Sequence, residues 1–536
     1  MKISKLLMLS AAIAGAFSAG AIAKPYPAGT QLATTQEITL NNGAEVTSID
    51  PAKQAAEPAF NLGRDLFEGL TIQDKTGTTI PGIASSWTVN DDNTVYTFSL
   101  RNAHWSNGDP VTAQDFVYSW QRLLDPQTAS PYAWFAAIPK IKNSDKIMKG
   151  EASPQTLGVR AIDAHTFEVT LEQSVPFFIK LLSHPVLAPV HQATVEKYAS
   201  EWTQPQYIVT NGAFTLSEWK VNEKLVMVKN PHYWDHENVV LEKITWLPIG
   251  DANVSLNRYL AGDIDEALSI PAAQKKKLLK EYPQQVANTS ASLGSRFYYL
   301  NTQKGPTQDV RVRKALSYAI DRNILTKAIL KNGGIPMYTL VPPQTDGFTS
   351  QTPEFANWNQ KQRNDKAKAL LAEAGYGKDK QLKLTFTLPT FSTDVKVATA
   401  MVGMWKSVLG AQVEIKQLEP KVFYALKDPG NISRGGWTAD YNEASTWLDL
   451  FVSTGEYNDS RYNNPKYDQL MADSKVLDDP SQEYLQAEAL LLDDMAIIPV
   501  YRPGNDQYLR QPYIGGYERT NPESSYYRKN VYVKAH

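Results

Sequence analysis

The chain has 536 residues, of which 42% are hydrophobic and 21% are charged, and it contains no cysteine. This length exceeds what a single hydrophobic core supports, so we expect two or three domains. A formal net charge of −2 excludes a strongly basic nucleic-acid-binding protein, and the absence of cysteine excludes disulfides, thiolate metal sites and a lipid attached to cysteine.

The N-terminal segment, residues 1–23, has the pattern of a secretory signal peptide. Lys2 and Lys5 form a basic segment before residues 6–17, which are apolar apart from Ser10, and Ala21-Ile22-Ala23 has the small-x-small pattern of a cleavage site. The apolar run is too short to cross a bilayer. Removal of the two lysines changes the net charge from −2 to −4 for the mature chain. The alternative interpretation is an N-terminal anchor that is retained.

Strand and helix patterns alternate along the rest of the chain, which predicts a mixed α/β fold. Alternating polar and apolar residues predict strands, whereas apolar residues at three- and four-residue spacing predict helices. We expect strands at 95–100, 167–171 and 382–388, a tight turn at 107–109, a helix start capped by Thr112, and helices at 366–374 and 397–408. No long flexible linker is found, so short crossovers suited to a hinge should join the domains.

No sequence pattern for catalysis or metal binding is found. His232 and His236 lie four residues apart, but Pro231 argues against a zinc-binding helix and favours a surface or packing role for the pair. The nucleophile elbow and the glycine-rich phosphate- and dinucleotide-binding loops are also missing. We therefore expect no enzyme and no cofactor. A hydrolase acting through residues distant in sequence is the alternative.

A series of short motifs runs through the chain. They are Asp50-Pro51, Arg64 to Leu70, Trp87, Tyr96 to Arg101, Trp105 to Phe116, Asn230 to Trp234, Gly262 to Asp265 and Asp309 to Leu316. In this order they resemble the peptide- and nickel-binding family of solute receptors that serve ABC importers, and the likeness covers essentially the whole mature chain. Residues 116–122 and 439–443 favour the oligopeptide-binding branch over the dipeptide and nickel receptors.

The resemblance implies a two-lobed α/β periplasmic-binding-protein fold with a hinge between the lobes and an additional inserted domain. The first lobe is expected to combine residues 24–67, 192–293 and 507–536. Residues 68–191 should form the additional domain, and residues 294–506 the second lobe, which should carry the anchors for the ligand's ends.

Residues 434–441, Arg-Gly-Gly-Trp-Thr-Ala-Asp-Tyr, carry the candidate ligand-binding groups. A zwitterionic peptide needs an anion for its ammonium end, a cation for its carboxylate end and backbone partners between them. Asp440 can accept hydrogen bonds from the ammonium, and Arg434 can hold the carboxylate. The two glycines let another backbone approach. The backbone groups expected to pair with a peptide strand belong to Gly436, Thr438 and Ala439.

The resemblance supports these roles. The family's amine-binding aspartate falls on Asp440, a carboxylate-binding arginine falls on Arg434, and a second basic anchor matches Lys331. Trp437 is expected to form a pocket wall, or else to be a core tryptophan. The alternative for Arg434 and Asp440 is that they neutralise each other in a domain interface.

The sequence departs from the family pattern at several positions. Asp394 stands where relatives carry a histidine that meets the ligand's carboxylate, and a like charge there is expected to repel a carboxylate. An acidic residue is missing near Ala55, and a tryptophan is missing near Pro420. Gly294 and Thr438 replace a cysteine pair. The preferred peptide length or terminal residue is therefore expected to differ.

The expected function is that of a periplasmic, non-lipidated binding component of an ABC importer, which captures short oligopeptides by their backbone and termini. Its expected partners are short peptides and an inner-membrane ABC permease, with no nucleic acid, no insertion into the membrane and a monomeric state. The alternatives are a receptor of the same fold for murein peptides, haem, antimicrobial peptides or another solute, a peptidase, and a sensory or chaperone role without transport.

Overall fold

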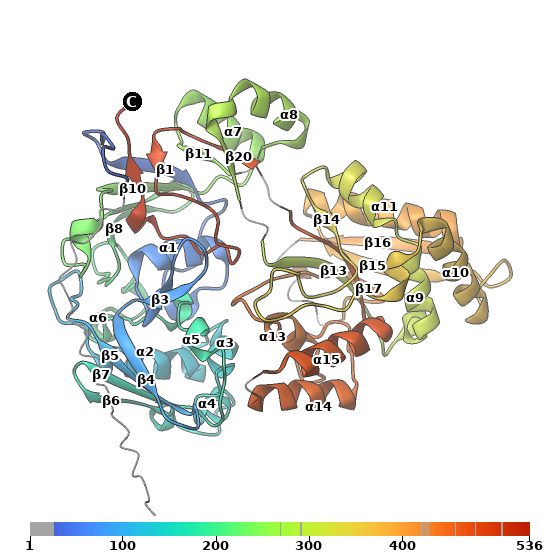
Figure 1. Ribbon diagram of the computed structural model, residues 1–536, viewed down its shortest axis with the longest axis horizontal. Coiled ribbons are helices and arrows are strands. Elements are labelled where there is room, and N and C mark those ends of the chain that lie inside the picture. Colours follow the sequence, from blue (N-terminus) through green and yellow to red (C-terminus); the bar gives the residue numbers. More distant parts are fainter. Residues whose placement is uncertain are drawn as a thin grey trace, which may run out of the picture.

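The computed structural model describes the following residues: 26–268, 270–289, 292–419, 422–423, 426, 428–455, 457–477, 479–504 and 507–536. The predicted signal peptide and Pro420 lie outside them. Figure 1 shows two halves, which we call the first half (residues 26–289 and 507–536) and the second half (residues 292–504). The chain passes between the halves after β12 (Val286–Asn288) and again after β19 (Ile497–Arg502).

Three small sheets and four α-helices come from the outer segments of the first half. The four-stranded sheet has the order β1-β10-β9-β8, in which only β1 and β10 are parallel. Its strands are β1 (Glu37–Asn41), β8 (Phe214–Lys220), β9 (Lys224–Lys229) and β10 (Lys243–Leu247). The other strands are β11 (Glu266–Ala267), β12 and β20 (Gln507–Arg510) in one sheet, and β21 (Ile514–Gly515) and β22 (Tyr532–Val533) in the other. The helices are α1 (Glu57–Leu66), α6 (Gln192–Tyr198), α7 (Ala252–Ala261) and α8 (Ala272–Glu281).

The middle segment of the first half forms a separate antiparallel sheet of order β4-β5-β7-β6 beside the hairpin β2–β3. The strands are β2 (Thr71–Gln73), β3 (Thr79–Pro81), β4 (Ala84–Val89), β5 (Val95–Leu100), β6 (Val159–Asp163) and β7 (Thr166–Thr170). The helices are α2 (Ala113–Leu124), α3 (Ala133–Ala137), α4 (Ser144–Met148) and α5 (Phe178–Leu181). As predicted, Thr112 is the residue before α2, where its N–H and its hydroxyl both donate to Oδ2 of Asp115.

The second half is built on one seven-stranded sheet of order β14-β19-β13-β17-β15-β16, with β18 paired to β13. Its strands are β13 (Gly294–Leu300), β14 (Ile335–Pro336), β15 (Lys383–Pro389), β16 (Gln412–Leu418), β17 (Ile432–Arg434), β18 (Trp437–Thr438) and β19. The α-helices described around it are α9 (Val310–Tyr318), α10 (Gln360–Glu373), α11 (Ser392–Leu409), α13 (Ser445–Leu448), α14 (Pro465–Asp473) and α15 (Ser481–Asp493). A π-helical segment follows α9 at Ile324–Leu330.

The predicted mixed α/β class is confirmed, and the periodic segments have the predicted type. The alternating segment 95–100 coincides with β5, and the helices α10 and α11 begin about five residues before their predicted starts. Gly375 and Gly410 have φ values of 82° and 64°, so the left-handed conformation that glycine tolerates ends both helices.

The division into a first lobe, an additional domain and a second lobe stays a prediction. The sheet topology supports it, whereas the apolar core does not separate the first lobe from the additional domain. No described sheet mixes strands from residues 68–191 with strands from elsewhere, and all strands of the seven-stranded sheet lie within 294–506. One continuous apolar cluster, however, includes residues of both the proposed first lobe and the additional domain. The two therefore share a core rather than packing as separate bodies.

Arg322 crosslinks the segments that support β19 in the second half. Its side chain is fully buried, and its Nε donates to the carbonyl oxygens of Met337 (3.0 Å) and Pro499 (2.8 Å). Its Nη atoms donate to the backbone oxygen and the hydroxyl of Ser317. The guanidinium also lies 4.5 Å from the centre of the Tyr338 ring.

We predict that Arg322→Met lowers the free energy of unfolding by about 3 kcal/mol or more, because it leaves several buried acceptors unpaired. Urea unfolding measures this change. Arg311→Met is the control, since Arg311 is half-exposed and pairs with Asp309 at the surface, and it should change stability far less than Arg322→Met does. Equal losses from the two variants would contradict the structural role of Arg322.

A candidate binding site between the two halves

The short strand β18 presents an unpaired edge. Its register with β13 places Thr438 opposite Gly294 and Trp437 opposite Ser295. The N–H of Ala439 donates to the Leu293 oxygen (2.8 Å), so odd-numbered residues of this strand direct their backbone groups to β13. The backbone groups of Gly436 and Thr438 then face the other way, where the structure describes no pairing strand.

This geometry divides the three predicted backbone contacts. Gly436 and Thr438 lie on the open edge, whereas the N–H of Ala439 is engaged within the protein. The two glycines admit neighbouring groups of β13: a Cβ at Gly435 would lie 2.7 Å from the Phe297 ring, and one at Gly436 would lie 2.9 Å from Cδ of Arg296 and 3.1 Å from the backbone oxygen of Ser295. Gly436 also has a φ of 150°, which disfavours other residues.

Asp440 lies at the contact between the two halves with one oxygen unpaired. The hydroxyl of Tyr132, in the first half, donates to its Oδ1 at 3.2 Å. Oδ2 is buried and has no hydrogen-bond partner among the described residues. No salt bridge to Asp440 is found in the described part of the chain, so the alternative that Arg434 neutralises it is not supported there.

Burial raises the pKa of Asp440 from 3.8 to about 7. The hydrogen bond from Tyr132 acts in the opposite direction, and the negative charges of Glu57 and Glu523 add to the increase. Burial likewise raises the pKa of Glu523 to about 7. This end of the site is thus rich in carboxyl groups that are costly to ionise without a cation.

Glu57 partly restores the acidic position that the sequence lacks at Ala55. It stands two residues further along, at the start of α1, and its Oε1 accepts a bond from Arg64 at 3.0 Å. Its charge is felt at Asp440 even though half of its side chain is exposed. The acid is therefore displaced along the chain rather than absent from this region.

Arg434 forms an ion pair with Asp394. The distance between Nε of Arg434 and Oδ2 of Asp394 is 3.2 Å, and their side chains are 17% and 11% exposed. Asp394 sits in the first turn of α11, where the helix dipole favours a negative charge. The expectation of a like charge near the ligand's carboxylate is thus refined: Asp394 has a cationic partner in the protein itself.

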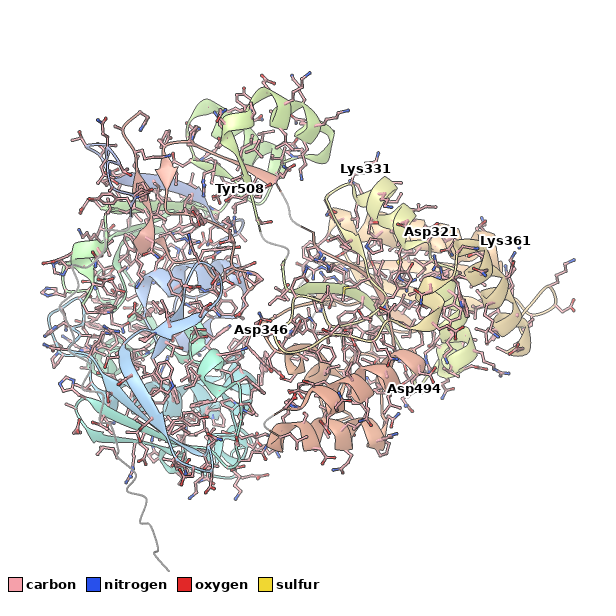
Figure 2. All side chains as sticks on the ribbon, in the orientation of Figure 1. Asp321, Lys331, Asp346, Lys361, Asp494 and Tyr508 are labelled. Atoms are coloured by element: carbon pink, nitrogen blue, oxygen red, sulfur yellow. The ribbon has the colours of Figure 1, made fainter. Side chains whose placement is uncertain are left out.

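Further polar groups surround this pair. The charges of Arg296, Arg434 and Asp394 all act on Tyr298 and Tyr501, so the five side chains form one cluster on the sheet. Lys331 is exposed and has a left-handed backbone (φ 53°). It precedes β14, which pairs with Tyr501 and Arg502, and Figure 2 places it at the edge of the second half. The role of Lys331 as a second basic anchor stays a prediction.

Trp437 forms the wall of an aromatic cavity between the halves. Its ring centre lies 6.2 Å from that of Trp134, in the first half, and 5.2 Å from that of Tyr457. Together with residues on both sides, these rings enclose about 130 Å³. A groove of about 600 Å³ adjoins this cavity and is also lined by both halves. The pocket-wall role of Trp437 remains a prediction that this placement supports.

Several contacts hold the halves against each other beside the site. Tyr441 is buried in the core of the first half, where its ring stacks on Phe177 at 5.1 Å. Lys180 pairs with Asp346 at 3.1 Å and donates to the Asn442 oxygen at 3.2 Å. Asp346 lies at the boundary in Figure 2. The segment 434–441 therefore enters the core of the first half at Tyr441, immediately after Asp440.

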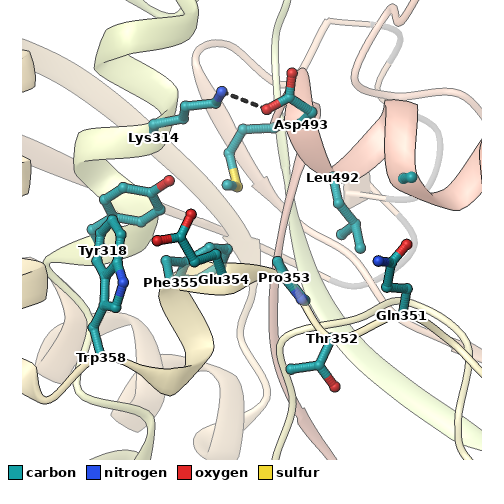
Figure 3. A pocket seen from close by; sticks show the side chains of 12 residues that line it. Lys314, Tyr318, Gln351, Thr352, Pro353, Glu354, Phe355, Trp358, Leu492 and Asp493 are labelled. Carbon is teal, nitrogen blue, oxygen red and sulfur yellow. Dashed lines mark hydrogen bonds and ion pairs between the residues drawn. The ribbon is translucent and has the colours of Figure 1, made fainter.

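Another pocket lies wholly within the second half (Figure 3). It measures about 300 Å³ and is lined by residues of α9, α15 and the segment 351–358, with Lys314 paired to Asp493 at 2.7 Å. It shares no residue with the site described above. Among the described residues, no group of acidic and histidine side chains is arranged to hold a metal ion, and no helix is long and apolar enough to span a membrane.

Sequence reasoning did not identify Tyr132, Glu523 or Arg296 as parts of the site. Tyr132 and Glu523 come from segments more than 80 residues away from Asp440 in the chain, and no local pattern links them to it. Arg296 lies in an alternating strand segment, whose register with β18 becomes visible only in the folded sheet. Tertiary contacts alone identify these residues.

Comparison with known proteins gives full-length matches. The sequence profile of the bacterial extracellular solute-binding proteins, family 5 Middle, matches residues 78–459. The chain is 44% identical to the periplasmic oligopeptide-binding protein OppA of Salmonella typhimurium, over 100% of this chain and 99% of that protein. It is also 44% identical to the periplasmic murein peptide-binding protein MppA of Escherichia coli, over 96% of each chain.

Solved structures show the same fold. MppA matches with a TM-score of 0.87 at 43% identity, over 95% of this chain and 100% of that one. Its unliganded open form matches with a TM-score of only 0.77, over 95% and 99% of the chains. OppA of Haemophilus influenzae in complex with RPPGFSPFR gives a TM-score of 0.84 at 37% identity, over 94% and 100%. The chain therefore superposes better on the first MppA structure than on the open form.

We predict that Asp440→Asn stabilises the ligand-free protein at high pH. Asp440 releases its proton near pH 7 in the folded protein but near pH 3.8 in the unfolded chain. Raising the pH from 4 to 8 therefore favours the unfolded state, and an uncharged asparagine removes this loss. The free energy of unfolding should rise by about 1–3 kcal/mol at pH 8 and change little at pH 4. A variant that is less stable than the parent at pH 8 would contradict this assignment.

Proposed function

Because the chain belongs to the family 5 extracellular solute-binding proteins, we propose that it captures short peptides between its two halves, with Asp440 holding the free ammonium end, and delivers them to an inner-membrane ABC permease. It is a periplasmic peptide-binding protein of an ABC importer and not an enzyme, and the resemblance read from the sequence is confirmed. The permease partner and a monomeric state belong to the proposal.

The observation that carries the proposal is the unpaired Oδ2 of Asp440. A buried carboxylate oxygen without a donor is costly, and an ammonium group supplies both the hydrogen bonds and the missing positive charge. The raised pKa of Asp440 expresses this cost. The position at the contact between the halves lets the same ligand touch both of them, which favours the closed arrangement.

The open edge of β18 supports a backbone mode of recognition. An extended peptide can add to an unpaired strand edge through main-chain hydrogen bonds, which carry affinity with little sequence preference. Gly436 and Thr438 direct their backbone groups to that edge. The aromatic cavity at Trp437 would then receive a ligand side chain beside the added strand.

A murein peptide is the second candidate ligand. The chain is as similar to MppA as to OppA at 44% identity, and the MppA structure matches with a TM-score of 0.87. A murein peptide also has a free amino end for Asp440 but carries more carboxylates than a simple peptide. The two candidates therefore differ mainly in what must meet the Arg434 end of the site.

Native mass spectrometry of the mature protein from a periplasmic extract, followed by release and sequencing of bound molecules, tests the function. We expect a set of intact short peptides with free amino ends. Murein peptides in the released fraction would favour the second candidate. A protein that carries no peptide, and takes up none from a mixture after unfolding and refolding, would contradict peptide binding.

We predict that Asp440→Ala weakens the binding of a free-amine peptide roughly 10- to 100-fold, because it removes a charge-assisted hydrogen bond. The N-acetylated form of the same peptide should lose far less, since it has no ammonium. Calorimetric titration of both forms measures the difference. Asp365→Ala, an exposed acid on α10 paired with Lys361, is the control and should change neither affinity. Equal losses for the two peptide forms would refute the amine-binding role.

A further inference from the structure

The ion pair between Asp394 and Arg434 changes what the second end of the site can recognise. We propose that this pair receives a neutral amide group of the ligand, either a backbone amide of a peptide that continues past it or a blocked C-terminus, in preference to a terminal carboxylate. The inference rests on the proposed function and adds the ligand class to it.

The two partners are held by different elements of the second half. Asp394 belongs to the first turn of α11, and Arg434 ends β17 in the middle of the sheet. Nε of Arg434 lies 3.2 Å from the Asp394 carboxylate, and less than a fifth of either side chain is exposed. Because helix and strand both fix their positions, the pair is built into the fold rather than formed by mobile surface side chains.

The pair's chemistry matches an amide. A guanidinium offers only donors and a carboxylate offers only acceptors. Side by side, they combine a donor group with an acceptor group, which is the complement of a C=O and an N–H. A terminal carboxylate has two acceptor oxygens and no N–H, so it can use Arg434 but meets a like charge at Asp394.

The charges around the pair decide how strong this preference is. The described charged groups that act on the same cluster are Arg296, Arg434 and Asp394, with the hydroxyls of Tyr298 and Tyr501 beside them. Arg296 brings a second cation to this cluster, and Lys331 adds another at the exposed edge of the second half. A ligand carboxylate is therefore still tolerated, but it loses much of the attraction that an unshared Arg434 would exert.

Paired peptides of identical sequence, one with a free C-terminal acid and one with a C-terminal amide, test the proposal at lengths of three, four and five residues. Calorimetric titration gives the ratio of acid to amide affinity at each length. In the unmodified protein the amide should bind roughly three- to tenfold more tightly than the acid at the length that places the C-terminus at the pair, and about equally at the other lengths. In Asp394→Asn, which keeps the shape but removes the charge, the ratio at one length at least should rise about tenfold in favour of the acid.

Two further variants fix the interpretation. Asp394→Glu keeps the negative charge and should keep the ratios of the unmodified protein, which separates charge from shape and also serves if the asparagine variant folds poorly. Asp365→Asn is the matched control for loss of one carboxylate far from the site. Thermal unfolding of each variant verifies that it is folded before titration.

The outcomes separate this inference from the proposed function. If peptides bind but the unmodified protein prefers the acid at any length, or Asp394→Asn does not shift the ratio toward the acid, Asp394 merely orients Arg434 for a carboxylate and the inference is overturned. If neither acids nor amides bind to any variant, the proposed function fails and the inference falls with it.

Discussion

A carboxylate with one buried oxygen at the contact between the two halves is the constraint on which the site depends. Asp440 receives one hydrogen bond from Tyr132 and has no partner for its second oxygen among the described residues. Its pKa of about 7 shows that the folded protein pays a penalty to keep this charge. Functional sites are where a fold departs from the rule that buried polar groups are satisfied. The missing donor is therefore better understood as a ligand's position than as a defect of packing.

The same few residues connect ligand recognition to the arrangement of the halves. Asp440 follows a strand that is bonded along one edge to β13, and Tyr441 follows Asp440 into the core of the first half. A ligand that bonds to Asp440 therefore acts beside the very contacts that close the protein. A ligand shifts an equilibrium only by its differential affinity for the two states. The environment of Asp440 is complete only when the two halves are in contact, so a ligand bound to Asp440 should favour the closed state.

Local patterns predicted most elements but only part of the site. The alternation at 95–100 and the helical spacing at 366–374 and 397–408 depend on near neighbours, so the sequence indicated these elements correctly. Asp440 and Arg434 were also found, through the segment they share. Their environments were not, because Tyr132 approaches from the other half and Asp394 approaches from a helix 40 residues earlier. The sign of a charge can be read from the sequence, but its partner cannot. Here the partner decides whether Asp394 acts on a ligand as an isolated negative charge or as half of an ion pair with Arg434.

The two ends of the site are consequently unequal. At one end Asp440 lacks a cationic partner among the described residues, so a ligand's ammonium gains an opposite charge and hydrogen bonds when it replaces water there. At the other end Arg434 already has Asp394, so a ligand's carboxylate must compete with a partner that is covalently part of the protein and loses no entropy on binding. Affinity should therefore be concentrated at the amino end of the ligand and along the open edge of β18. Such a site selects for the presence of an amino end and an extended backbone while leaving the distance to the other end of the peptide free to vary.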